Sequence, residues 1–142
     1  MTIKPGDALP SLAAPEINVT RIAQVMDVMD DNNPVHIDEE LVKKLGLRGL
    51  VNQGPCNLAY ITNMLTAWAG TPDAVRRFQI RFHNMVCPGD KLTAEGRVAA
   101  IHPDGLVECD VALKLDDGTT MLAGTATMLP PRGTATMLPP RE

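Results

Sequence analysis

The sequence predicts an α+β fold in which a long central helix is wrapped by a curved antiparallel β-sheet. Residues 49–72 carry no charged side chain although 21% of the chain is charged, so a helix in this stretch has to be enclosed by the rest of the protein. After residue 70 the spacing of apolar residues changes from three or four to two, which is typical of half-buried strands. Helices first and strands afterwards form an α+β pattern, and the turn signals between the strands predict an antiparallel arrangement.

The composition indicates a single domain and excludes several classes of protein. A chain of 142 residues and 15.3 kDa can bury a core without disulfides or metal. A net charge of -4 with no run of Lys or Arg argues against a nucleic-acid partner. The three cysteines lack ligand spacing, no apolar signal segment opens the sequence, and six Asn, Gln and Thr residues interrupt the central apolar stretch. We therefore expect a cytoplasmic protein with no metal site and no membrane partner.

The segment before the central helix is expected to hold two shorter helices. Residues 1–15 are rich in Pro, Ala and Gly and predict an irregular lead-in, followed by a short strand at residues 17–19. Thr20 is expected to cap a helix that ends at the turn 30–34, because the proline of that turn cannot continue a helix. The apolar residues of this helix recur at helical spacing: Ile22, Val25, Met26 and Met29. A short helix at 38–45 follows, with acidic side chains at its start and lysines at its end.

The central helix is expected to run from Gly54 to Ala69. Pro55 suits its first turn, and Gly70 suits the position just after its end. Alternating apolar residues then predict four strands, at residues 77–83, 92–98, 107–115 and 120–129. Reversal signals separate them at residues 88–90, 103–105 and 116–118.

A sequence of nine residues occurs twice at the end of the chain, as 124–132 and again unchanged as 133–141. The first copy completes the last strand, whereas the second follows a Pro-Pro break with no strand left to pair with. We expect the domain to occupy residues 1–132 and residues 133–142 to be a disordered, dispensable tail, with an added edge strand or an interface role as the alternatives. Removal of this tail is expected to leave the melting temperature unchanged.

The residues most suited to chemistry lie in the turn that starts at Asp31. Spacing alone favours a structural interpretation, in which Asp31 and Asn33 bond backbone amides and His36 packs. The functional alternative is that the turn sets the Asp31 carboxylate and the His36 imidazole on one side of a pocket, where they hold and polarise one water molecule. An imidazole suits this role because it exchanges protons near neutral pH.

Four features carry a resemblance to a known family: the Asp31-x-Asn33-Pro34-x-His36-x-Asp38 motif, the Val51-x-x-Gly54 turn, Arg81-Phe82, and Pro88-Gly89-Asp90. With them the chain resembles the MaoC-like (R)-specific enoyl-CoA hydratases and the related (3R)-hydroxyacyl-ACP dehydratase subunits over about residues 5–130. The resemblance implies the hotdog fold and a homodimer, or a heteromer with another hotdog subunit. It also implies hydration of trans-2-enoyl-CoA to (3R)-3-hydroxyacyl-CoA, or the reverse, with no cofactor beyond the CoA or ACP thioester.

The resemblance also assigns catalytic roles. Asp31 and His36 match the catalytic pair, and Gly54 matches the glycine whose backbone amide meets the thioester oxygen. A helix N-terminus offers a free amide and partial positive charge where negative charge develops on that oxygen. Because both side chains lie on one loop, one water can serve both carbons from the same face, which implies syn addition.

Asn33, Gln53, Thr62 and Arg81 are the expected substrate-binding residues. Gln53 departs from the family, which commonly has His there; it can donate a hydrogen bond but cannot carry a proton, and a helix-cap role is its alternative. Thr62 could touch the acyl thioester or pack in the core. Arg81 could meet CoA phosphates, or it could belong to a solvated strand face.

Two other classes of hotdog protein stay open. A thioesterase often draws a carboxylate from the long helix, but residues 55–69 contain no acid. A non-catalytic subunit can lack the Asp and His that this chain has. The sequence leaves open the carrier, the acyl chain and the direction of the reaction.

Overall fold

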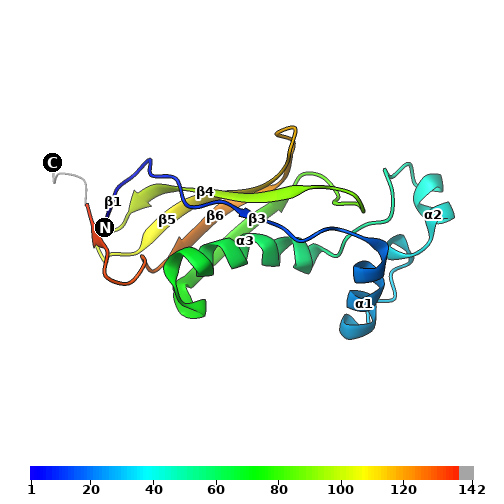
Figure 1. The fold of residues 1–142 in the computed structure, drawn as a ribbon, viewed down its shortest axis with the longest axis horizontal. Coiled ribbons are helices and arrows are strands. Elements are labelled where there is room, and N and C mark those ends of the chain that lie inside the picture. Colours follow the sequence, from blue (N-terminus) through cyan, green and yellow to red (C-terminus); the bar gives the residue numbers. More distant parts are fainter. Residues whose placement is uncertain (138–142) are drawn as a thin grey trace.

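The computed structural model describes residues 1–137 of the chain. Helix α3 (Gly54–Ala69) lies along one face of an antiparallel sheet, while α1 (Val19–Met29) and α2 (Glu39–Lys44) lie beyond the end of the sheet, near the N-terminus of α3 (Figure 1). The expected hotdog architecture is confirmed. Gly70 ends α3 with a positive φ of 74°, a conformation that glycine adopts without strain.

The main sheet has five strands in the order β2-β4-β5-β6-β3, and every neighbouring pair is antiparallel. Their bounds are β2 Leu12–Ala13, β3 Val75–Phe82, β4 Leu92–Ile101, β5 Val107–Leu115 and β6 Thr120–Met128. The four long strands were expected, but β3 pairs with β6 rather than with its successor β4. The 88–90 turn is therefore not a hairpin. It belongs to the connection from the edge strand β3 to β4, which lies near the opposite edge of the sheet.

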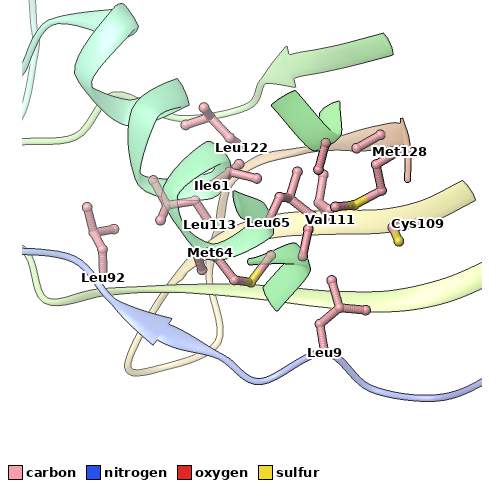
Figure 2. Close-up of a cluster of buried hydrophobic side chains, with 14 of the residues drawn as sticks. Leu9, Ile61, Met64, Leu65, Leu92, Cys109, Val111, Leu113, Leu122 and Met128 are labelled. Atoms are coloured by element: carbon pink, nitrogen blue, oxygen red, sulfur yellow. The ribbon is translucent and has the colours of Figure 1, made fainter. Parts of the chain in front are cut away.

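The core lies between α3 and the sheet. Ile61, Met64 and Leu65 of α3 are buried, and Figure 2 shows them facing the strand residues Leu113 and Leu122. This packing explains why the middle of α3 carries no charge, because a charged group buried here would lack a partner.

The glycine at position 124 allows strand β6 to approach β3. A Cβ there would lie 1.9 Å from the Gln79 carbonyl oxygen. A larger residue would therefore push the two strands apart.

Helix α1 differs from the expectation at its start. The cap is Asn18, whose Oδ1 accepts a hydrogen bond from the Arg21 N–H at 2.9 Å, so the expected cap at Thr20 is wrong. The strand expected at 17–19 is absent from the structure, because Val19 already belongs to the helix. An Asn with extended backbone satisfies one of the unpaired amides of the first helical turn. The chain therefore enters the helix at Val19, although the β-branched residues at 17 and 19 had suggested a strand.

The two chain ends meet in a second, two-stranded sheet. Strand β1 (Thr2–Ile3) pairs in parallel with β7 (Ala135–Thr136), close to the N-terminus (Figure 1). The expectation that the second sequence copy has nothing to pair with is thus wrong for β7, while residues 138–142 of the expected tail lie outside the described residues. Within the described part of the chain, no helix is both long and apolar enough to cross a membrane.

Candidate active site

The turn after α1 is built by short-range hydrogen bonds. Asp30 adopts a left-handed conformation with a φ of 51°, which short polar residues tolerate. The Asn33 N–H donates to Asp31 Oδ1 at 3.1 Å, and Asn33 Oδ1 accepts from the Val35 N–H at 3.3 Å. A 3₁₀ turn, Pro34–His36, then brings the imidazole back toward Asp31. The structural interpretation of Asp31 and Asn33 is confirmed, and the same turn brings Asp31 and His36 together.

The second oxygen of Asp31 faces the imidazole. Asp31 Oδ2 lies 3.1 Å from His36 Nε2, and His36 Nδ1 lies 2.6 Å from the Val51 carbonyl oxygen. A carbonyl only accepts, so His36 Nδ1 carries a proton. A direct Nε2–H bond to Asp31 then requires the cationic imidazole, whereas the neutral ring turns an acceptor nitrogen toward the carboxylate. In the neutral form, one water lying to the side of this 3.1 Å contact can donate to both groups.

The two members of the pair differ in exposure. The side chain of His36 is 7% exposed and that of Asp31 is 31% exposed. The imidazole is therefore held rigidly by its surroundings, while the carboxylate reaches solvent and can meet a ligand.

Helix α3 begins at Gly54, beside the segment that holds His36. The N–H groups of a first helical turn have no acceptor within the helix, and Gln53 makes no side-chain cap bond to them. Gly54, Asn57, Phe82 and Met85 help to line a hollow of about 640 Å³. The hollow takes in Val51 but not Asp31 or His36 themselves, so the Asp31–His36 pair flanks the hollow instead of lining it.

Three buried amide side chains surround the start of α3. Gln53 is only 1% exposed, its Nε2 donates to the Ile22 carbonyl oxygen at 3.0 Å, and its Oε1 has no hydrogen-bond partner among residues 1–137. Asn52 Nδ2 donates to Asn57 Oδ1 at 2.7 Å and lies 3.4 Å from the Tyr60 hydroxyl. The side chain of Gln53 is thus directed at α1 rather than at the hollow. Sequence reasoning missed Asn57, whose only signal is an amide early in an otherwise apolar helix.

The structure does not bring Thr62 and Arg81 to the Gly54 amide. The Thr62 hydroxyl donates to the Leu58 carbonyl oxygen at 3.0 Å, about 12 Å along the helix from Gly54 at 1.5 Å per residue. Arg81 is exposed on β3. It precedes Phe82, whose ring approaches Gly54, and successive strand residues point to opposite faces. Arg81 therefore lies on the face of the sheet away from α3.

An ion pair that sequence reasoning did not foresee braces the hollow. Arg48 donates to both carboxylate oxygens of Asp90, at 3.1 and 2.7 Å, and to the Met85 carbonyl oxygen at 3.0 Å. Asp90 also accepts from the Cys87 N–H at 2.9 Å. The hydrogen bond to Asp90 raises the pKa of Arg48 above its ordinary value. These bonds give the Pro88-Gly89-Asp90 motif a structural role, because they fix the loop that carries Met85.

The described residues offer no set of side chains suited to bind a metal ion. Within residues 1–137, no group of three or more His, Cys, Asp or Glu side chains could hold a metal ion. What the site offers instead is a carboxylate, an imidazole and a helix N-terminus, which suits proton transfer beside a stabilised oxyanion.

Comparison with known proteins gives one family and many similar folds. Residues 11–109 match the sequence profile of the MaoC like domain. No curated protein sequence matches the chain.

The unliganded R-hydratase PhaJ1 from Pseudomonas aeruginosa is 21% identical, with 99% of this chain and 92% of that chain covered and a TM-score of 0.78. The ChsH1-ChsH2 complex from Mycobacterium tuberculosis is 23% identical, with coverages of 88% and 96% and a TM-score of 0.75. A MaoC-like dehydratase is 27% identical, with coverages of 89% and 39% and a TM-score of 0.78. The first two likenesses show a shared fold.

Proposed function

The chain belongs to the MaoC-like family of hydratases and dehydratases, and from that premise we propose that it catalyses the (R)-specific hydration of trans-2-enoyl-CoA to (3R)-3-hydroxyacyl-CoA, and the reverse dehydration. The observation that carries the proposal is the contact of 3.1 Å between Asp31 Oδ2 and His36 Nε2, with His36 Nδ1 held by the Val51 carbonyl oxygen at 2.6 Å. A carboxylate and an imidazole are thereby held side by side, so that one water beside their contact can hydrogen-bond to both.

In the hydration direction, the water held by Asp31 and His36 attacks the β carbon of the enoyl thioester. As its oxygen bonds to that carbon, one of its protons passes to the pair, and the electron pair of the double bond moves toward the thioester oxygen. The pair then returns one proton to the α carbon. The sum is one water added across the double bond, and both new bonds form on the face that the pair occupies.

Gly54 is proposed to stabilise the charge that develops on the thioester oxygen. Its N–H lies at the start of α3, where the helix dipole is positive. A backbone donor aimed at such an oxygen contributes about 10²–10³ in rate. The hollow of about 640 Å³ next to Gly54 supplies room for the thioester and the carrier arm.

The remaining expected contacts keep narrower proposed roles. Asn33 shapes the catalytic turn through its two hydrogen bonds. Gln53 and Thr62 are proposed to act through the position of α3, because their side-chain donors are bonded to the Ile22 and Leu58 carbonyl oxygens. Arg81 is proposed to meet phosphates of the carrier from the exposed edge strand.

The proposed assembly is a cytoplasmic homodimer. Strand β3 has eight residues and lies at the edge of the sheet, and natural proteins cover or blunt long edges. A second copy could pair with this edge, and a different hotdog chain is the alternative partner. Light scattering of the purified protein, alone and mixed with such a chain, separates the two assemblies by mass.

The proposal is tested by presenting 2-butenoyl-CoA and 2-butenoyl-ACP to the purified protein and resolving the chirality of the product. We expect loss of the ultraviolet absorbance of the enoyl thioester and formation of the (3R)-hydroxy product. A (3S) product would overturn the assigned face, and release of free thiol would indicate a thioesterase. Turnover of the ACP thioester alone would identify ACP instead of CoA as the carrier. Turnover only after addition of a second hotdog chain would favour a heteromer.

A further inference from the structure

Asn57 presents a polar group to the hollow at Gly54 that the mechanism above does not use. It lies three residues after Gly54 on α3, which puts the two on neighbouring positions of one helical face, and both line the hollow. Asn57 is only 3% exposed, and a buried amide is costly unless its polar atoms are hydrogen-bonded. The bonds that this side chain makes therefore show what it can still offer to a ligand.

A hydrogen bond from Asn52 fixes the orientation of the Asn57 carboxamide. Asn52 Nδ2 donates to Asn57 Oδ1 at 2.7 Å, so the Nδ2 of Asn57 is turned away from this bond, and it has no acceptor among residues 1–137. In that part of the chain, Gln53 Oε1 is the one polar side-chain atom of a buried or half-buried residue that is sealed from solvent without a partner. Asn57 Nδ2 therefore reaches open space, which is the hollow that Asn57 lines.

The same bond places the Asn57 amide at the beginning of α3. Helical side chains lean toward the N-terminus of their helix, and Asn57 reaches far enough back to meet Asn52, which precedes the helix. The Gly54 N–H belongs to this first turn and has no acceptor within the helix. A backbone donor and a side-chain donor thus face one hollow from the same end of α3.

We propose that Asn57 Nδ2 is a second donor to the thioester oxygen, beside the Gly54 N–H, and that Asn52 is a positioning residue that holds it. The inference rests on the proposed function. As water adds to the β carbon, negative charge grows on this oxygen, and a donor fixed in advance stabilises the charge without reorganisation. Because a carboxamide does not titrate, Asn57 adds no step to the pH dependence that the Asp31–His36 pair gives to kcat.

The test compares two substitutions that keep different contacts. Asn57→Asp keeps an acceptor for Asn52 and suits a helix N-terminus, but it removes the donor, whereas Asn57→Leu removes both polar atoms. Asn63→Asp is the matched control, exposed on the same helix. We expect both Asn57 variants to lower kcat for the 2-butenoyl thioester by about 10²–10³, with KM changing less than about threefold. A loss confined to Asn57→Leu, a loss confined to KM, or an equal loss in Asn63→Asp would overturn the proposal.

Infrared spectra of an unreactive bound thioester separate this inference from catalysis. The isotope-labelled carbonyl of butanoyl-CoA or butanoyl-ACP should absorb at lower frequency on wild type than in water, because fixed donors polarise it more strongly, and both Asn57 variants should reverse part of this shift. If wild type hydrates no enoyl thioester but shows the shift and its partial loss, the catalytic proposal fails and the Asn57 contact stands. Equal carbonyl frequencies in wild type and Asn57→Leu would overturn the contact even in an active enzyme, and so would failure of both thioesters to bind.

Discussion

The carbonyl oxygen of Val51 determines how His36 can act. Because it lies 2.6 Å from Nδ1, the ring is left with Nε2 as the nitrogen that faces Asp31. Spacing alone favoured a structural role for the turn, and it was the resemblance to the family that favoured a meeting of Asp31 and His36. The sequence did not predict the partner of Nδ1, which lies 15 residues away and depends on how the loop before α3 folds back.

Gln53 offers a test of the packing between α1 and α3. Gln53→Ala should destabilise the protein by about 1–3 kcal/mol, because it leaves a cavity and removes a buried hydrogen bond. Gln53→Met keeps the volume and removes the oxygen that has no partner, so it should cost less than Gln53→Ala. Urea unfolding of the two variants measures the difference. A larger loss in Gln53→Met would show that Oε1 has a partner in solution.

At the scale of elements, the start of α3 joins the core to the site. Most of this helix followed from the sequence, since its lack of charge, its early proline and its final glycine all agree with the observed bounds. For α1 the helix was predictable, but its environment was not. Apolar spacing predicts a face that avoids water, but two of its four residues, Val25 and Met29, line a surface groove, and only Ile22 is buried.

The role of the Gly54 amide can be tested without unfolding the helix. Proline is tolerated at the first helical position, and the ψ of 135° at Gln53 suits a residue that precedes proline. Gly54→Pro should therefore keep the fold while removing the N–H, and kcat should fall by about 10²–10³.

Gly54→Ala is the matched variant, because it keeps the amide. Its added Cβ would lie 3.5 Å from the Phe82 ring, an ordinary contact, so it should fold and keep more activity than Gly54→Pro. Circular dichroism checks the helix in both variants. Equal kcat values for Gly54→Pro and wild type would remove Gly54 from the oxyanion site.

At the scale of the whole molecule, pairing between distant strands was the least predictable feature. Alternation located β3 to β6 within a few residues, because the spacing of apolar side chains is local. The β3–β6 pair joins residues about 40 to 53 positions apart and the β1–β7 pair residues about 133 apart, and no local pattern specifies such partners. The contact between Gly54 and the Phe82 ring depends on the same pairing of distant strands. The sequence motifs alone therefore could not predict which residues line the hollow.

The repeated segment has a measurable structural role in this arrangement. The N–H groups of Ala135 and Met137 donate to the Met1 and Ile3 carbonyl oxygens, at 2.9 and 3.0 Å. Removing residues 133–142 should therefore cost about 1–3 kcal/mol, from two hydrogen bonds worth about 0.5–1.5 kcal/mol each. Thermal unfolding of the truncated and full chains measures this loss. An unchanged melting temperature would restore the view of a dispensable tail, and complete unfolding would show a larger role than the two bonds explain.

The most direct test of the central claim is kcat for hydration of 2-butenoyl-CoA by wild type, Asp31→Asn and His36→Ala. Asp30→Asn and His102→Ala are the matched controls, because Asp30 is an exposed neighbour whose left-handed backbone suits Asn, and His102 bonds to Glu108 on the distant β4–β5 end of the sheet. If Asp31 and His36 move the protons, both variants should lose about 10²–10⁴ in kcat while the two controls stay near wild type. An active wild type whose Asp31→Asn or His36→Ala variant kept full kcat would contradict the account.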